Sequence, residues 1–223
     1  MPHGFSFIRK DIAVEKSQRF LPHWEQPDVC YFLTFRTADS IPAGILSEWK
    51  SERDAWLRAH GIDPGIDDWH SRIASLRDDE SAIYHARFSR QMQEFLDDCH
   101  GDCLLRRADL REIVVRALRH FDGERYRLGG FVVMPNHAHI LVQLIGEMRL
   151  KGVGFSWKHF TAREINKVLG EEKCERFWQA ETYDHIVRSE AQFHHYRKYI
   201  AENPLKARLR ENEASVYLPE LEK

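Results

Sequence analysis

The pattern of apolar and polar residues predicts a chain in which strands and helices are mixed. Aromatic and β-branched residues concentrate in a few short stretches, which is typical of strands. These strands are expected at 31–37, 126–134 and 137–144, with short extended segments at 177–178 and 183–187. Pro135 and Asn136 separate two of them by only a tight turn, so residues 126–144 are predicted to form a hairpin.

Other stretches carry apolar residues at helical spacing. Helices are expected at 44–60, 67–98, 109–121 and 156–169, with a final helix from near Ser189 to close to Asn203. Pro204 sets that last limit, because proline disfavours a helical backbone on the residue before it. Gly152-Val153-Gly154 is interpreted as part of a connection.

The first two helical stretches are acidic and amphipathic, and we find no catalytic motif in them. Residues 44–105 are therefore interpreted as a scaffolding segment inserted into a single domain that spans 1–223. Residues 211–223 are expected to be a short C-terminal tail, with no appended DNA-binding domain.

Composition indicates a folded protein, since hydrophobic residues make up 43% of the 223 positions. No apolar run approaches the roughly 20 residues that cross a bilayer, and the N-terminus has no signal-peptide pattern. With four cysteines there is no disulfide framework, so we expect a cytoplasmic, nucleoid-associated protein without a membrane partner. Cys99 and Cys103 with His100 between them could suggest zinc, or simply two thiols one helical turn apart.

The net charge of −2 does not by itself indicate a nucleic-acid binder. Its distribution is uneven, because acids dominate residues 39–102 and bases dominate residues 149–210. A basic half of a chain can attract phosphates, although solvated helix faces would give the same pattern.

His137 and His139 stand two residues apart on a predicted strand, so their side chains point to the same face, about 7 Å apart along it. Ala138, Ile140 and Val142 then form an apolar face on the other side. Two neutral imidazoles on one face can share a metal ion, or they can be hydrogen-bonded histidines of the sheet.

Tyr199 and Asn203 stand four residues apart on the final helix, one turn from each other. An amide oxygen is a suitable third ligand for a hard ion such as Mg²⁺ or Mn²⁺. The alternative is a buried tyrosine followed by an asparagine that ends the helix. Tyr196 lies one turn earlier, but its partner four residues on is Ile200, which cannot bind metal.

Several blocks together resemble one family. Residues 133–142 (VMPNHAHILV) resemble the signature strand of the HUH nucleases, specifically the REP-associated tyrosine transposases, and residues 199–207 (YIAENPLKA) resemble their nucleophile helix. Further similar blocks lie at 31–37, 156–161, 177–179 and 183–188, so the resemblance covers about 29–210. One departure is Arg208, at a place where the family often has glycine.

The resemblance implies an α+β fold, with a ferredoxin-like antiparallel sheet flanked by helices. It also implies metal ligands His137, His139 and Asn203 for Mg²⁺ or Mn²⁺, with Tyr199 as the nucleophile. Tyr199 would cleave single-stranded or REP-like hairpin DNA through a 5′-phosphotyrosine intermediate, in a monomer or homodimer. Candidate DNA contacts are Arg36, Trp157, Lys158, Arg163, Arg188, Arg197 and Lys198.

Three other functions stay open at this point. The chain could bind DNA hairpins without cutting them, or it could be another HUH nickase, such as a replication or conjugation relaxase. A metallohydrolase that uses water as its nucleophile would need the histidines but not Tyr199.

Overall fold

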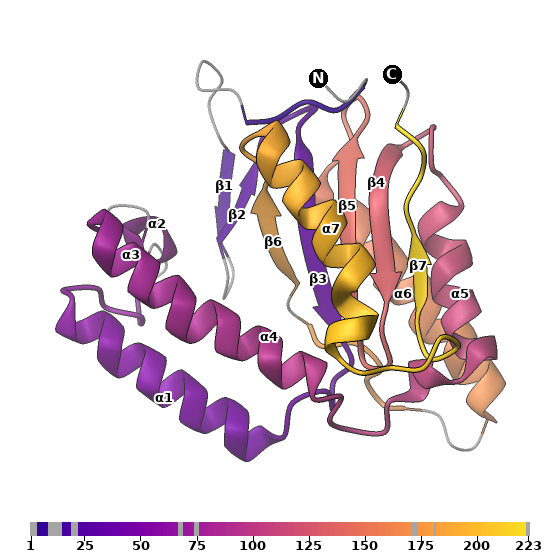
Figure 1. Ribbon diagram of the computed structural model, residues 1–223, viewed down its shortest axis with the longest axis horizontal. Helices are drawn as coiled ribbons and strands as arrows, with labels where there is room; N and C mark the ends of the chain where they lie inside the picture. The colour runs from indigo at the N-terminus through magenta and orange to yellow at the C-terminus, as the bar shows by residue number, and fades with distance from the viewer. Residues whose placement is uncertain are drawn as a thin grey trace.

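The computed structural model describes residues 4–8, 15–18, 22–66, 69–73, 76–170, 174–180 and 182–221. A five-stranded antiparallel sheet forms its centre, in the order β6-β3-β5-β4-β7 (Figure 1). Its strands are β3 (Cys30–Arg36), β4 (Tyr126–Val133), β5 (His137–Leu144), β6 (Tyr183–Ile186) and β7 (Ser215–Tyr217). A separate hairpin pairs β1 (Glu15–Gln18) with β2 (Pro22–Glu25).

The connectivity of strands β3, β4, β5 and β6 matches the expected fold class. In chain order β3, β4, β5 and β6 are the first to fourth strands, and their spatial order is fourth, first, third, second. Helices connect the first to the second and the third to the fourth, which is the ferredoxin-like βαββαβ arrangement. The α+β prediction is confirmed. The predicted tail 211–223 additionally supplies β7, an edge strand that pairs with β4, and its residues 222–223 lie outside the described part.

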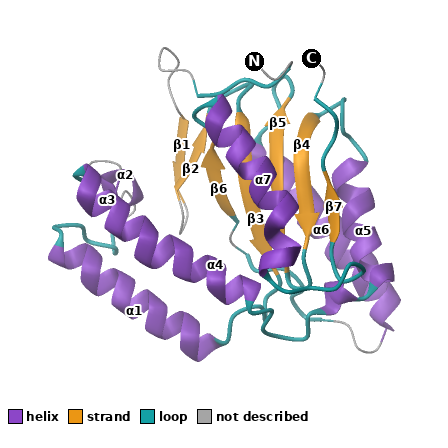
Figure 2. Ribbon diagram, viewed as in Figure 1, coloured by secondary structure: helices purple, strands orange, loops and turns teal. Residues whose placement is uncertain are grey.

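Helices cover both faces of the sheet (Figure 2). Helices α5 (Ala108–Arg119) and α6 (Leu150–Leu169) pack on one face, and α7 (Glu190–Lys206) lies on the other. Alternate residues of β5 divide between these layers. Ala138, Ile140 and Val142 belong to the larger core with α5 and α6, whereas Leu141 packs in the cluster that contains α7. The predicted two-faced character of β5 is therefore observed.

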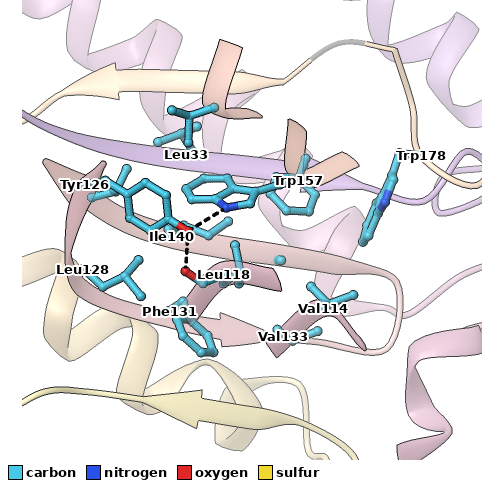
Figure 3. Close-up of a cluster of buried hydrophobic side chains, with 14 of the residues drawn as sticks. Leu33, Val114, Leu118, Tyr126, Leu128, Phe131, Val133, Ile140, Trp157 and Trp178 are labelled. Atoms are coloured by element: carbon cyan, nitrogen blue, oxygen red, sulfur yellow. Dashed lines mark hydrogen bonds between the residues drawn. The ribbon is translucent and has the colours of Figure 1, made fainter. Parts of the chain in front are cut away.

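The core beneath α6 contains a buried tryptophan and a buried tyrosine whose polar groups are hydrogen-bonded (Figure 3). Trp157 Nε1 donates a hydrogen bond to the Tyr126 hydroxyl at 3.1 Å, and that hydroxyl donates to the Leu118 carbonyl at 2.8 Å. Burial of both aromatic rings thus leaves no polar group without a partner, as buried tyrosine and tryptophan require.

The segment between β3 and α5 is helical, as predicted, and packs around its own small cluster beside the sheet (Figure 1). Its helices are α1 (Ala43–Ala59), α2 (Trp69–Ile73), α3 (Asp78–Tyr84) and α4 (Arg90–Asp97), and a π-helical turn (His85–Ser89) joins the last two. A short 3₁₀ turn (Leu104–Arg106) precedes α5.

The prediction of one helical stretch over 67–98 is wrong, although 67–68 and 74–75 lie outside the described residues. A new helix starts at Asp78, because Arg77 has an extended backbone and its N–H donates to the Glu80 carboxylate at 3.2 Å. Three acids in the first turn favour the same start, since they face the positive end of the helix dipole.

Two predicted helix limits are also wrong. Helix α6 starts at Leu150, so Gly152-Val153-Gly154 is helical rather than a connection. Burial of Leu150 and Val153 against the core outweighs the poor helix propensity of the two glycines, which is of order 1 kcal/mol each.

Helix α7 continues past Pro204 to Lys206 because its end is closed by a well-formed C-terminal motif. Arg208 adopts the left-handed backbone (φ 53°), its N–H donates to the Leu205 carbonyl at 3.0 Å, and the Leu209 N–H donates to the Pro204 carbonyl at 2.9 Å. This is the position where glycine was expected, and the backbone keeps the glycine-like conformation. None of the helices in the described part combines the length and apolarity needed to cross a membrane.

Candidate active site

The two histidines of β5 lie side by side on the face that α7 covers. Both are fully buried, and their ring centroids are 4.7 Å apart. Across the ladder, His139 pairs with Thr34 and His137 pairs with Arg36 on β3. The predicted placement of both imidazoles on one strand face is therefore what the fold produces.

His139 is contacted at both ring nitrogens. Its Nδ1 lies 2.7 Å from the Thr34 hydroxyl, and its Nε2 lies 3.2 Å from the Tyr199 hydroxyl. The amide nitrogen of Gln93, from α4 of the helical segment, also lies 3.2 Å from Nε2. Residues from the sheet, from α7 and from the helical segment thus meet at one imidazole.

His137 is contacted at one ring nitrogen only. Its Nδ1 lies 2.8 Å from Asn136 Oδ1, and the Asn136 amide nitrogen donates to the His100 carbonyl at 3.1 Å. The Nε2 atom is buried and has no hydrogen-bond partner among the described residues.

Asn203 shows the same lack of partners, one helical turn after Tyr199. It is fully buried, and neither its amide oxygen nor its amide nitrogen is hydrogen-bonded within the described residues. Nearly all buried polar groups in proteins are paired, so orphaned ones need an explanation such as an ion. His137 Nε2 and Asn203 Oδ1 are therefore the atoms of this face that fit a missing partner.

The chemistry of the side chains agrees with that fit. Burial lowers the pKa of His137 to about 3 and lowers the pKa of His139 well below its usual value, with His137 adding to the effect. Both imidazoles are thus neutral at neutral pH, the form that binds metal. In the described part no three His, Cys, Asp or Glu side chains cluster tightly enough to hold an ion, so these residue types alone do not complete a site here. The same finding gives no support to zinc at Cys99, His100 and Cys103.

Two tyrosines of α7 differ clearly in what they contact. Burial raises the pKa of Tyr199, the negative charge of Asp97 raises it further, and its hydroxyl faces His139. Tyr196 instead stacks on Phe32, with ring centroids 4.1 Å apart and planes within 6° of parallel. Tyr199 is therefore the tyrosine whose hydroxyl lies at the histidines.

Several of the predicted DNA-binding residues lie near this face. Arg36 is next to His137 through strand pairing, and one of its nitrogens donates to the Ser40 hydroxyl at 3.0 Å. Arg188 is exposed just before α7, and Lys198 is exposed on that helix. A cation that was not singled out is Lys206, whose Nζ lies 5.2 Å from the centre of the Tyr199 ring.

Trp157 and Lys158 are structural residues on the opposite side of the sheet. Trp157 is 4% exposed and packs within the core. The Lys158 ammonium donates to the Gln179 and Ala180 carbonyls at 3.2 and 2.7 Å and thereby holds the segment before β6. Both side chains thus have structural roles, and a DNA contact of either residue stays a prediction.

The remaining two candidates also have internal partners. Arg163 on α6 pairs with Glu164 at 3.0 Å, on the face away from Tyr199. The Arg197 guanidinium donates to the Gly129 carbonyl and, at 2.9 Å, to the Pro219 carbonyl. Arg197 therefore ties α7 to β4 and to the C-terminal segment.

Sequence reasoning missed four residues that contact the site, directly or through one neighbour: Thr34, Gln93, Asp97 and Asn136. Strand alternation gives the face of β3 on which Thr34 lies, but its contact with His139 depends on the pairing of β3 with β5. No local pattern identifies Gln93 or Asp97, because α4 approaches His139 only through the tertiary fold.

The fold and the site together describe an antiparallel sheet whose paired histidines face a tyrosine on a covering helix. Residues 106–203 match the family model described as "Transposase IS200 like". The matched segment contains both histidines, Tyr199 and Asn203, and covers less than half of the chain. The predicted similarity to transposases is thereby confirmed for this segment.

Two solved structures are similar at a low level. One is the REP-associated tyrosine transposase bound to a REP hairpin, 12% identical, covering 89% of this chain and 73% of that chain, with a TM-score of 0.39. The other is a candidate transposase from Deinococcus radiodurans R1, 13% identical, covering 88% and 98%, with a TM-score of 0.31. At these TM-scores the likenesses carry no argument about function. No curated protein matches the chain significantly.

Proposed function

We propose that this chain is a metal-dependent tyrosine transposase that cuts and rejoins single-stranded or hairpin DNA. The observation that carries the proposal is the Tyr199 hydroxyl, 3.2 Å from His139 Nε2. It lies on the same face as the orphaned His137 Nε2, and one turn from the orphaned Asn203 amide. The family match of residues 106–203 supports the same class of activity.

The atoms that would hold the ion are Nε2 of His137, Nε2 of His139 and Oδ1 of Asn203. The amide oxygen and the waters that would complete the shell suit Mg²⁺ or Mn²⁺, and the two neutral imidazoles would supply nitrogen ligands. When bound, such an ion supplies positive charge that favours the phenolate and the transition-state phosphate.

Tyr199 performs the chemical step in this proposal. Its oxygen bonds to the phosphorus of the scissile phosphate while the bond from phosphorus to the 3′-oxygen breaks, giving a 5′-phosphotyrosine and a free 3′-hydroxyl. The phenol loses one proton and the departing oxygen gains one. Because the new bond is again a phosphodiester, a 3′-hydroxyl of a second strand can reverse the step and rejoin DNA.

The choice among the alternative functions depends on Tyr199. A hairpin-binding protein needs no nucleophile at the histidines, and a hydrolase would use water. Other HUH nickases share the tyrosine chemistry, and they are distinguished from a transposase by whether a second strand is joined. The active species would be a monomer or a homodimer.

The decisive experiment compares two conservative variants, Tyr199→Phe and Tyr196→Phe. Each removes one hydroxyl and keeps the ring, so packing changes little. A labelled library of hairpins with randomised single-stranded flanks is incubated with Mn²⁺, and covalent protein–DNA adducts are separated under denaturing conditions.

We expect the adduct in the unmodified protein and in Tyr196→Phe, and its loss in Tyr199→Phe and in excess chelator. Peptide mapping of the adduct should place the nucleotide on Tyr199. Cleaved DNA without an adduct would indicate a hydrolase, and retarded but uncut DNA would indicate a binding protein; either result contradicts the proposal.

A further inference from the structure

Each candidate metal-binding histidine has an amide side chain beside it that determines which ring nitrogen carries the proton. A neutral imidazole has one N–H and one lone pair, and only the nitrogen with the lone pair can bind an ion. The contacts of the second nitrogen or of neighbouring donors therefore decide whether the site can form.

For His137 the deciding group is Asn136. The His100 carbonyl can only accept, so the end of the Asn136 amide that faces it at 3.1 Å is the NH₂ group. The oxygen end then faces His137 Nδ1 at 2.8 Å and has to accept from it. His137 is consequently protonated at Nδ1, with its lone pair on Nε2.

For His139 the deciding group is Gln93. Its amide nitrogen lies 3.3 Å from an Asp97 carboxylate oxygen, which as an anion can only accept. The same nitrogen lies 3.2 Å from His139 Nε2, so it donates there. The other neighbours of the ring are the hydroxyls of Thr34 and Tyr199, and a hydroxyl can either donate or accept. Among the described side chains Gln93 is the one that fixes the direction, because it donates to the lone pair on Nε2, and an ion bound at that nitrogen would take the place of this donor.

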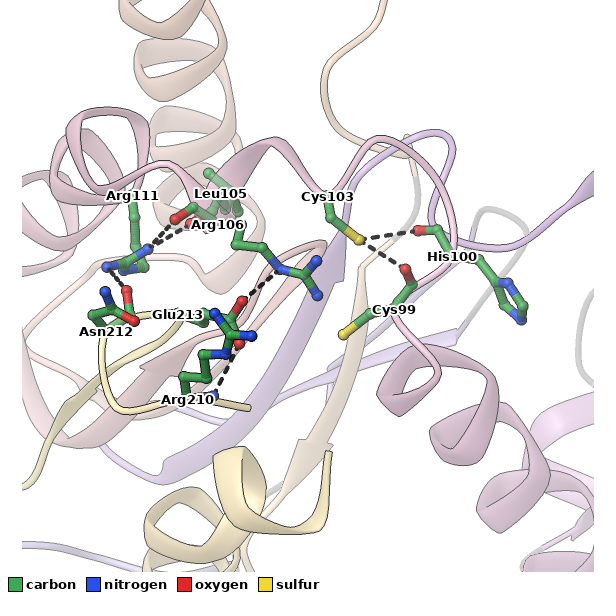
Figure 4. A network of polar contacts seen from close by, with 9 residues as sticks. All are labelled: Cys99, His100, Cys103, Leu105, Arg106, Arg111, Arg210, Asn212 and Glu213. Carbon is green, nitrogen blue, oxygen red and sulfur yellow. Dashed lines mark hydrogen bonds and ion pairs between the residues drawn. The ribbon is translucent and has the colours of Figure 1, made fainter. Parts of the chain in front are cut away.

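Both anchoring acceptors come from the end of the inserted helical segment. Asp97 is the last residue of α4, and His100 lies in the loop that follows. That loop is held internally, because the Cys103 thiol donates to the Cys99 carbonyl at 2.8 Å and reaches the His100 carbonyl at 3.7 Å (Figure 4). The Asp102 N–H donates to the Asp39 carboxylate at 2.7 Å, which ties the loop to the chain beyond β3.

We propose that the end of the inserted segment is part of the active site, where Asp97 with Gln93 and the His100 carbonyl with Asn136 hold both histidines in the Nδ1–H form. Gln93 and Asn136 are positioning residues, since they act through the imidazoles. That the two Nε2 lone pairs bind a metal ion rests on the proposed function, whereas the position of the proton on each ring does not. The segment interpreted from sequence as a scaffold thus contributes to the chemistry.

The test is to move the proton of the His139 imidazole from one ring nitrogen to the other, by a substitution of nearly equal size at a neighbouring residue. In Gln93→Glu the group beside His139 Nε2 changes from a donor to an acceptor, so His139 should move its proton to Nε2. His137 serves as an internal reference, because Asn136 rather than Gln93 lies at its Nδ1, and it should keep its Nδ1–H form. Gln91→Glu is the matched control, because it makes the same substitution two residues away on α4, on a different side of the helix.

The measurement is two-dimensional NMR of ¹⁵N-labelled imidazoles at pH above 7, in chelator and without DNA, with signals assigned from histidine variants. We expect Nδ1–H for both rings in the unmodified protein and in Gln91→Glu, and Nε2–H for His139 alone in Gln93→Glu. An Nε2–H form of His139 in the unmodified protein, or an unchanged ring in Gln93→Glu, would overturn the inference. Because no ion or DNA is present, this outcome is independent of whether Tyr199 forms an adduct.

Discussion

Asp97 lies at the end of α4, hydrogen-bonded to Gln93, and burial raises the pKa of its carboxyl from 3.8 to about 6. The donor Gln93 and the cation Lys206 oppose that rise but do not cancel it. A partly buried carboxylate close to Tyr199 therefore costs folding free energy at neutral pH. In return, the carboxylate accepts the hydrogen bond that orients the Gln93 amide.

The pH dependence of that cost can be measured with Asp97→Asn. Between about pH 4 and pH 6 the folded protein keeps the Asp97 proton that the unfolded chain releases, so the free energy of unfolding falls as the pH rises through this window. Asp97→Asn does not titrate, so it should unfold at higher urea than the unmodified protein at pH 8. This difference should disappear near pH 4.

The exposed neighbour Asp98 provides the control, because Asp98→Asn removes a carboxylate that is largely in water. The measurement is the urea midpoint of unfolding of the unmodified protein and both variants, in chelator, at pH 8 and near pH 4. Equal midpoints for Asp97→Asn and the unmodified protein at pH 8 would contradict the burial cost assigned to this side chain.

Single residues also mark the limit of what sequence can predict about the site. Spacing alone paired His137 with His139 and Tyr199 with Asn203 but left a structural alternative for each pair, and the family resemblance decided between them. Gln93 could not be selected from the sequence, because it reaches His139 across 46 positions through packing of α4 against the sheet. Contacts of that kind depend on the whole fold.

Helix α7 carries Tyr199, and it packs closely on strand β4 at Gly129. A bulge interrupts the β4–β5 register between Leu128 and Gly130, and Gly130 has a positive φ of 148°. At Gly129 a Cβ atom would lie 2.9 Å from the Phe193 ring of α7 and 3.0 Å from Leu141. The absent side chain at Gly129 therefore lets α7 approach the strand that carries the histidines.

Gly129→Ala should consequently move α7 rather than unfold the sheet. We expect a loss of stability of about 1–3 kcal/mol, as for other overpacked sites, and a fall in adduct formation larger than the loss of folded protein explains. Thermal unfolding and the adduct assay on the same samples measure the two effects.

Gly152→Ala is the matched control for the same chemical change. Nothing lies within 4 Å of a Cβ at Gly152, and it sits in helix α6, so alanine there should stabilise by about 0.5–1 kcal/mol. Unchanged adduct formation in Gly129→Ala would show that the position of α7 does not depend on this contact.

At the level of elements, local signals predicted some helix limits and missed others. Ser189 was expected to begin the final helix, and its hydroxyl accepts from the Gln192 N–H at 3.2 Å. The helix end at Lys206 was missed, because the closing bonds form around Arg208 in a backbone conformation that its residue type disfavours. Strand β7 was missed as well, since three residues gain their structure only by pairing with β4.

For the molecule as a whole, the net charge of −2 hides two oppositely charged regions. The acidic stretch found in the sequence contains the helices of the inserted segment, and α7 carries Lys198 and Lys206 on its exposed side. The Lys206 ammonium lies 5.2 Å from the centre of the Tyr199 ring. If Tyr199 attacks a phosphate as proposed, we expect this ammonium to contact the DNA beside it.

Lys206 and Lys167 make a matched pair for testing that contact. Their side chains are 51% and 63% exposed, and each is paired with a glutamate on its own helix, at 3.4 Å for Lys206 and 2.8 Å for Lys167. Such surface pairs contribute little to stability, so replacing either lysine by glutamine should leave the fold intact. They differ in location, because Lys206 is on α7 and Lys167 is on α6, across the sheet.

Lys206→Gln should weaken binding of single-stranded DNA and reduce the slope of log affinity against log salt by about 0.7, the contribution of one phosphate contact. Lys167→Gln should leave both quantities unchanged. Fluorescence anisotropy with a labelled single strand, titrated at several salt concentrations, measures affinity and slope together. If both variants lowered the slope equally, DNA would be attracted by the general charge of the C-terminal half, and the proposed contact of Lys206 would be wrong. A smaller slope in Lys206→Gln alone would place a phosphate beside Tyr199, where the proposed attack requires it.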